Sequence, residues 1–313
     1  MGKQIQRRKG LLRELATNRT LYLMCAPAIL LFFLINYLPL FGLILPFKEF
    51  SFSLGIVRSP WADPLFRNFE FFFRSGILWR ITRNTLLYNL AFIVIGNAVA
   101  VTLAVMLNEV RSKTFVKVSQ ASFLLPYFMS WIVGGMLLQA LLAYDFGVIN
   151  GLLRRFGLDR IDWYGTPEAW PGILVIADNW REGGYRTVLY LAALAGISPE
   201  LYEAAEVDGA SRWKQIKAIT TPLLMPIVTI LSLLEVGRIM NADFGKFYAL
   251  VGENSRLYPT ADVIDTYVFR TLRSLGNVGM AAAPATIQSV IGFFLVILVN
   301  SYTRRKFPEG SLF

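Results

Sequence analysis

Long apolar segments are the feature that most constrains how this chain folds. A helix needs roughly 20 predominantly apolar residues to cross the hydrocarbon core of a bilayer, and about six stretches approach that length. They are residues 21–45, 84–107, 119–143, 171–195, 219–236 and 283–302. Backbone polar groups in lipid have to be hydrogen-bonded within their own segment. The sequence therefore predicts an all-α polytopic membrane protein with about six transmembrane helices.

Two of these segments are less regular than the others. Proline removes a helical hydrogen bond, so Pro222 and Pro226 predict a kink near the start of the fifth segment. Hydropathy alone would miss the fourth segment because it contains four charged residues. These are Asp178, Arg181, Glu182 and Arg186.

The composition agrees with a lipid environment and excludes several kinds of site. Hydrophobic residues make up 55% of the chain and the mean hydropathy is +0.50, whereas soluble domains are about 45–50% apolar. The chain contains no histidine, which removes histidine-based triads and imidazole metal sites, and we expect no metal site. Cys25 is the single cysteine and we interpret it as a packing residue.

Basic residues predict the orientation in the membrane, because short cytoplasmic flanks carry an excess of Lys and Arg. They cluster in the arm 1–20, in the tail 304–313, in the loop after the second segment and in the polar segment 196–218. All four regions lie on one side of a six-segment chain, so we expect both termini to be cytoplasmic. Topology also accounts for the net charge of +10, and we expect no nucleic-acid partner.

Two connections on the opposite side are long. Residues 46–83 include Phe69 and Phe71 to Phe73 but are too polar to span, so we expect an interfacial aromatic segment. Lipid anchoring is favoured there over stacking against a sugar. Residues 237–282 form a long connection, and long ordered loops are usually functional.

The polar segment between the fourth and fifth spans predicts a short helix that docks another protein. Ser198 suits the N-cap and Pro199 the first helical position. Ala204 and Ala205 carry small side chains, so another surface can approach the helix backbone. Gly209 permits a sharp turn, and Ser211 can cap a second helix that leads back into the bilayer.

The spacing of this segment resembles the coupling loop of permeases in binding-protein-dependent ABC importers. The matching positions are Glu203, Ala204, Ala205, Gly209, Ile219 and Pro222, whereas Thr221 replaces the usual leucine. Other short sequence stretches resemble the polysaccharide and oligosaccharide branch of the family. They include residues 37–42, 84–86, 125–131, 190–209 and 264–268. Within that branch the chain is similar to the first permease subunit of alginate importers.

This resemblance implies a fold, a function and partners. The fold is that of type I (MetI-like) permeases, with a first helix 21–45, an interfacial segment 46–83 and a core 84–303 that contains the coupling loop 196–218. The residues expected to couple to the ATPase are Glu203, Ala204, Ala205, Asp208, Gly209, Ala210 and Arg212. The implied partners are a second homologous permease, two ATPase subunits that bind ATP and Mg²⁺, and a periplasmic solute-binding protein. The chain would then lie in the bacterial inner membrane. It would bind no cofactor and catalyse no reaction.

Ionisable and polar residues at membrane depth are costly and tend to face cavities or partners. The candidates for the substrate pathway are Asn179, Trp180, Arg181, Glu182, Arg186, Arg238, Asn241 and Asp243. Arginines in this set could pair with the carboxylates of an alginate-type acidic glycan. Subunit packing and internal ion pairs explain the same residues equally well.

Other functions remain open at this point. An ABC permease for neutral oligosaccharides, peptides or amino acids would share the coupling motif. A secondary transporter or channel would also be polytopic, but it would need its own ion site and gives no reason for the cytoplasmic loop. An intramembrane enzyme is disfavoured because the chain has no histidine.

Overall fold

Residues 18–306 are described in the computed structural model, and their regular elements are helices. Most of the predicted arm 1–20 and tail 304–313 lies outside this range. Four described segments are long and apolar enough to cross a membrane, namely Arg19–Phe47, Ile77–Asn108, Arg212–Val236 and Val278–Arg305. The first consists of α2 (Arg19–Phe32) with a π-helical turn (Phe33–Tyr37) and a 3-10 helix (Leu38–Phe47), and the second is α5 (Ile77–Asn108).

The third predicted span is wrong as a single helix. The chain forms α6 (Lys113–Leu124), a 3-10 turn (Leu125–Phe128) and α7 (Trp131–Leu142), and the two helical parts meet at 100°. Pro126 lies in the 3-10 turn, where its missing N–H breaks the α-helical ladder. Ser130 then has an extended backbone and its hydroxyl accepts a hydrogen bond from the N–H of Val133. A new helix therefore starts there in another direction.

The fourth and fifth predicted spans are continuous helices. α9 (Trp170–Leu194) has 25 residues, which is roughly 37 Å, and its charged residues make it less apolar than the four segments above. The fifth span consists of α11 (Arg212–Gln215), a π-helical turn (Ile216–Thr220) and α12 (Thr221–Val236). The π-helical turn lies just before Pro222, near which the sequence predicts a kink.

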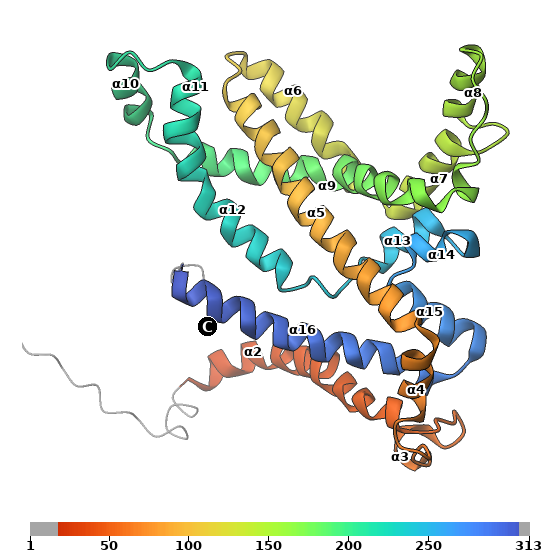
Figure 1. The fold of residues 1–313 in the computed structure, drawn as a ribbon. Coiled ribbons are helices and arrows are strands. Elements are labelled where there is room, and N and C mark those ends of the chain that lie inside the picture. Colours follow the sequence, from red (N-terminus) through yellow and green to blue (C-terminus); the bar gives the residue numbers. More distant parts are fainter. Residues whose placement is uncertain (1–17, 307–313) are drawn as a thin grey trace, which may run out of the picture.

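Short helices connect the long ones. Figure 1 shows α10 (Pro199–Val207) beside α11 at one end of the molecule, on the side where α2 begins and α16 (Val278–Lys306) ends. The other connecting helices gather toward the opposite end. They are α3 (Gly55–Arg58), α4 (Arg67–Ser75), α8 (Val148–Arg155), α13 (Phe244–Val251), α14 (Tyr258–Ala261) and α15 (Ile264–Leu275), with 3-10 turns at Trp163–Gly165, Pro167–Ala169 and Ser255–Leu257.

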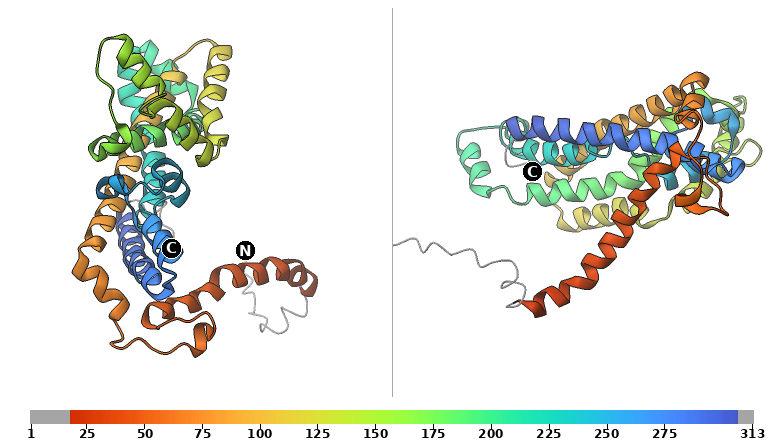
Figure 2. Two further views of the ribbon diagram at one scale, coloured as in Figure 1. Left: turned by 90° about the vertical axis from the view of Figure 1, so that its right-hand side faces the viewer. Right: turned by 90° about the horizontal axis from the view of Figure 1, so that it is seen from below.

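The core lies where α5 packs along α9 and where α13 and α14 cover both. Trp170 and Phe247 are fully buried there, and Tyr88 donates a hydrogen bond of 2.9 Å to the carbonyl of Thr260. The α2 helix buries none of its residues and extends away from the rest of the molecule (Figure 2). An apolar helix of this kind is stable only against lipid or another protein.

Candidate coupling helix and transport cavity

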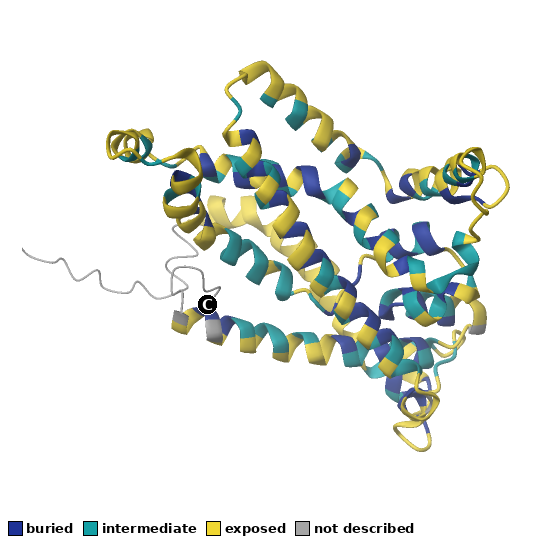
Figure 3. Cartoon of the chain, turned by 45° about the horizontal axis from the view of Figure 1, so that its top comes forward, coloured by how far each residue is buried: buried dark blue, intermediate teal, exposed yellow. Residues whose placement is uncertain are grey.

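The exposed helix α10 begins at Pro199, as the sequence predicts. Ser198 occupies the N-cap position, as predicted, although its side chain makes no capping hydrogen bond. None of the residues of α10 is buried, and the helix stands apart from the bundle (Figures 1 and 3). The hydroxyl groups of Tyr202 and Thr220 lie 3.0 Å apart and connect α10 to the start of α12.

The turn after α10 is held by specific contacts. Gly209 has a φ of +73°, a conformation that other residues adopt only with strain. The N–H of Ala210 donates to the carbonyl of Ala205 over 2.8 Å. Arg212 forms an ion pair of 2.7 Å with Glu206, and Ser211 caps α11 as predicted, since its hydroxyl accepts from the N–H of Lys214. These contacts join α10 firmly to the α11–α12 helix.

Several side chains of α10 and of the following turn make no polar contact with the described residues and are exposed. Val207 is 89% exposed and Trp213 is 74% exposed. Glu203 and Asp208 are exposed as well and form no ion pair with residues 18–306. Large exposed apolar side chains next to unpaired carboxylates are typical of a binding surface.

A second group of residues forms a buried charge network between four helices. Asp178 of α9 is fully buried. One of its carboxylate oxygens accepts from Arg186 over 3.0 Å and the other pairs with the ammonium group of Lys246. The same ammonium group lies 4.0 Å from the ring centre of Phe92. A buried carboxylate of this kind is stable because two cations neutralise it.

The network continues toward α12 through amide and phenol groups. Arg186 approaches Glu235 to 3.4 Å, and the other Glu235 oxygen accepts from the amide of Asn97 over 3.0 Å. The hydroxyl of Tyr190 donates to the Asn97 carbonyl oxygen over 2.8 Å. Gly96 leaves room for the Arg186 guanidinium, because a Cβ there would overlap it. Helices α5, α9, α12 and α13 are thus connected through polar side chains.

Arg181 stabilises the break between α6 and α7. Its Nε donates 2.9 Å to the carbonyl of Met129, an acceptor that lies at the break, and its guanidinium pairs with Glu182. The same group lies 4.6 Å from the ring centre of Trp131 and 5.7 Å from that of Tyr127. Non-helical backbone at membrane depth requires such partners.

A polar cavity of ≈ 390 Å³ lies between α5, α9 and α12. Its lining combines two arginines, two glutamates, an amide and two tyrosines with leucines. The residues are Asn97, Glu182, Tyr185, Arg186, Leu189, Tyr190, Leu231, Leu234, Glu235 and Arg238. Arg238 is exposed and forms no ion pair with the described residues. This cavity therefore offers one uncompensated cation beside aromatic rings.

The remaining candidates of the substrate pathway lie elsewhere. Asn179 donates to the carbonyl of Val175 over 2.8 Å within α9. Asp243 caps α13 and accepts from the indole N–H of Trp131 over 2.9 Å. The side-chain oxygen of Asn241 accepts from Gln288 over 3.1 Å.

Asp265 stabilises the connection between α12 and α13. Its carboxylate accepts 3.0 Å from the N–H of Ala242. Burial raises the pKa of Asp265, whereas the hydrogen bonds from Ala242 and Gln288 oppose that rise. This group therefore fixes the backbone that positions Asp243 and Lys246.

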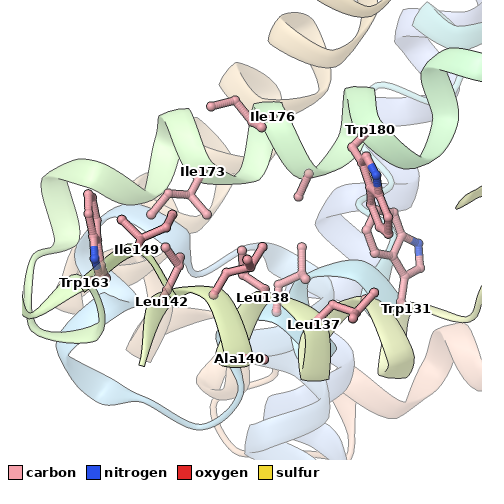
Figure 4. Close-up of a pocket in the computed structure, with 14 residues that line it drawn as sticks. Trp131, Leu137, Leu138, Ala140, Leu142, Ile149, Trp163, Ile173, Ile176 and Trp180 are labelled. Carbon is pink, nitrogen blue, oxygen red and sulfur yellow. The ribbon is translucent and has the colours of Figure 1, made fainter. Parts of the chain in front are cut away.

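Trp180 lines a separate apolar cavity of ≈ 570 Å³ between α7 and α9. Figure 4 shows Trp131 and Trp180 close together at one end of it, with Trp163 at the other. The lining contains no charged side chain. Of the eight candidates, Glu182, Arg186 and Arg238 line the polar cavity, and Trp180 lines the apolar cavity. Arg181 supports the break between α6 and α7, and Asp243 caps α13. Asn179 and Asn241 make hydrogen bonds outside both cavities.

The sequence analysis missed four polar residues of the network and cavity, namely Asn97, Tyr185, Tyr190 and Glu235. A signal was present for two of them, because Asn97 and Glu235 are polar residues inside apolar spans. No group of three or more potential metal ligands occurs among the described residues.

Comparisons with known proteins agree with this architecture. The profile of the family described as "Binding-protein-dependent transport system inner membrane component" matches residues 96–307. The polygalacturonan/rhamnogalacturonan transport system permease of Bacillus subtilis is 32% identical over 97% of the chain and 94% of that relative. The trehalose/maltose permease of Thermococcus litoralis is 29% identical over 76% of the chain and 80% of its own length.

Solved structures are similar over almost the whole chain. A chain in the crystal structure of a bacterial alginate ABC transporter, in complex with a periplasmic protein that binds an alginate pentasaccharide, superposes with a TM-score of 0.85. It is 32% identical and covers 95% of this chain and 98% of its own. A second structure of a bacterial ABC transporter that imports the acidic polysaccharide alginate gives a TM-score of 0.86 at 32% identity.

Proposed function

The chain belongs to the family of inner membrane components of binding-protein-dependent transport systems, and from that premise we propose that it is a permease subunit of an ATP-driven importer of acidic oligosaccharides or polysaccharides. The observation that carries the substrate class is the near full-length similarity to a polygalacturonan/rhamnogalacturonan permease and to an alginate transporter. Uronate polymers are anionic, and the cavity between α5, α9 and α12 contains an unpaired arginine.

We propose that α10 receives the motion of the ATPase subunits. Its exposed surface has room for a partner, and its contacts through Tyr202 and Arg212 connect it to the α11–α12 helix. Glu235 at the other end of α12 contacts the buried network. A displacement of α10 would thus be transmitted along α12 to the polar cavity. This transmission would couple the ATPase subunits to alternating access of the cavity.

The partners proposed for the chain are a second homologous permease, two ATPase subunits and a periplasmic solute-binding protein. ATP and Mg²⁺ are then bound by the ATPase subunits, and this chain catalyses no reaction. In this arrangement residues 196–218 and both termini face the cytoplasm of a bacterial cell, and residues 46–83 lie at the outer interface. The basic residues of these flanks support that orientation.

Arg238 is the proposed contact for substrate carboxylates, with Tyr185 beside it in the cavity. Arg186 is already paired with Asp178 and Glu235, and Arg181 is paired with Glu182. An additional anion therefore finds its partner at Arg238, where a charge-assisted hydrogen bond contributes roughly 1.5–3 kcal/mol.

A neutral oligosaccharide is the second candidate substrate. The similarity to a trehalose/maltose permease and the stacked pair of Tyr127 and Tyr185, whose ring centres are 4.6 Å apart, favour it. Aromatic faces bind sugar rings without regard to charge. Peptides and amino acids are less compatible with the relatives described above.

The test is ATP hydrolysis by the complex purified with its co-encoded partners and binding protein. We expect uronate oligosaccharides to stimulate hydrolysis more strongly than neutral oligosaccharides of the same length. Equal or stronger stimulation by neutral glycans would favour the second candidate. Stimulation by peptides alone would contradict the assignment to sugar transport.

A further inference from the structure

A groove of ≈ 530 Å³ lies between the end of α5, the first half of α6 and the last turns of α9. Its walls are formed by Leu107, Asn108, Val110, Lys113, Val116, Lys117, Gln120, Val188, Leu191, Ala192 and Ala195. The groove is separate from the polar cavity and from the apolar cavity beside Trp180. Its volume lies within the range of small-molecule sites, roughly 300–1,000 Å³.

The polar groups of the groove are concentrated on α6. Lys113 and Lys117 are four residues apart and therefore project from the same face of the helix. Both are exposed and neither forms an ion pair with residues 18–306. No acidic side chain lines the groove. Gln120, one further turn along, supplies an amide that donates hydrogen bonds.

The rest of the groove is apolar and runs along the last turns of α9, the predicted fourth span. Val188, Leu191 and Ala195 recur at helical spacing on α9, and small side chains on this face leave space beside the helix. In Figure 1 the start of α6 and the end of α5 lie at the end of the molecule that carries α10 and α11. The cationic entrance therefore lies at the membrane boundary on the α10 side.

We propose that this groove binds one anionic phospholipid of the leaflet on the α10 side. Lys113 and Lys117 bind the phosphate of the headgroup, Gln120 donates to the phosphate or to the glycerol ester, and an acyl chain lies against Val188 and Leu191. The choice of occupant follows from charge: two unpaired cations at a membrane surface attract anionic lipids, and the apolar walls fit a hydrocarbon chain. A zwitterionic lipid would leave the net positive charge uncompensated.

The test uses the whole transporter complex in vesicles of phosphatidylcholine with or without phosphatidylglycerol. Phosphatidylglycerol retained after detergent extraction is measured by mass spectrometry. Each lysine near an anionic surface contributes about fivefold in affinity, so K113Q/K117Q should lower retention roughly 25-fold. The charge-conserving variant K113R/K117R should keep the lipid. Inorganic phosphate should not displace it, because phosphate lacks the acyl chain.

Two further variants keep the result decisive. Ala192→Phe leaves both lysines in place but fills the groove, and it should also release the lipid. Arg304→Gln removes an exposed cation at the end of α16, outside the groove, and should have no effect. Unchanged retention in K113Q/K117Q, or an equal loss in Arg304→Gln, would overturn the proposal. So would the absence of retained lipid in the unmodified complex, which indicates that a partner subunit covers the groove.

Discussion

Charged side chains of the buried network and of the polar cavity fall into two groups by their surroundings. Asp178 and Glu235 together compensate the charges of Arg186 and Lys246. Arg238 is exposed to the cavity and has no ionic partner among the described residues. An ionised group in the interior is stable only when paired. The first group therefore contributes to folding, and Arg238 is available for a ligand.

Replacing the central carboxylate should destabilise the protein. Asp178→Asn leaves Arg186 and Lys246 close together without their common anion, so we expect a loss of about 3–5 kcal/mol. Thermal unfolding of the assembled complex measures it. The exposed pair of Asp145 and Arg160 provides the control, and Asp145→Asn should change stability by only about 0.5 kcal/mol. If Lys246→Met does not restore part of the loss in Asp178→Asn, the ion pair is not its cause.

Arg238, which lines the polar cavity, and Arg181, which supports the α6–α7 break, should respond differently to neutralisation. Arg238→Gln should lower the apparent affinity for uronate oligosaccharides by about tenfold or more and leave neutral glycans unaffected, as measured by stimulated ATP hydrolysis. Arg181→Gln removes the donor to the Met129 carbonyl and should lower the yield of assembled complex instead. An equal effect of Arg238→Gln on charged and neutral glycans would assign it a structural role.

At the scale of elements, the geometry of single turns determines how helices are joined. The turn at Gly209 sets the direction between α10 and α11. In α9, Gly184 lies against the backbone of α6 so closely that a Cβ would overlap the carbonyl oxygen of Phe123. The neighbouring Gly183 has open space around its Cβ position. The two adjacent glycines thus differ in how closely a neighbouring helix packs against them, and the sequence pattern does not reveal this difference.

Substitution in the turn after α10 should separate ATP hydrolysis from substrate binding. Gly209→Asp adds strain at a positive φ and a charge at the proposed docking surface, and we expect lower substrate-stimulated hydrolysis. Bulky replacements of Ala204 should act in the same way. Gly157→Asp is the matched control, because Gly157 has a φ of +72° and lies in the connection after α8. Similar losses in both glycine variants would indicate strain alone, and normal stimulation in Gly209→Asp would rule out coupling through this turn.

Packing of α9 against α6 should depend on one of the two adjacent glycines. Gly184→Ala should cost about 1–3 kcal/mol because two backbones have to move apart. Gly183→Ala should be neutral or stabilise α9 by up to about 1 kcal/mol, since alanine favours the helix. Thermal unfolding of the assembled complex compares them. A larger loss for Gly183→Ala would contradict the packing described here.

At the scale of the whole molecule, helix ends and short connecting helices gather on two opposite sides. The start of α2, the end of α16 and α10 lie on one side of the bundle, with α8 and α13 to α15 toward the other (Figure 1). This arrangement agrees with the distribution of basic flanks, from which we predict that the first side faces the cytoplasm.

Cysteine labelling in intact cells should establish the topology. In a Cys25→Ala background, cysteines introduced at Asp159 and Arg256 should react with a membrane-impermeant reagent added outside. A cysteine at Glu206 should react only after the membrane is opened. All three positions are exposed, so access depends on the side of the membrane. Labelling of position 206 from outside would overturn both the orientation and the role of α10.

The sequence by itself determined the features that depend on local composition and spacing. Apolar runs located the first, second, fifth and sixth predicted spans, basic flanks predicted an orientation, and Ser211 and Gly209 were assigned their positions around α10 correctly. Such features are local because lipid and helix geometry act on consecutive residues.

Only the tertiary structure decided which distant polar groups meet. Asp178 joins Lys246 across 68 positions of sequence, and Tyr190 joins Asn97 across 93. The 100° break between α6 and α7 likewise persists because Arg181, from another helix, satisfies the Met129 carbonyl at that break. Hydropathy and helical periodicity contain no information about such pairings. They arise when packed helices exclude water and each buried charge has to find its partner within the fold.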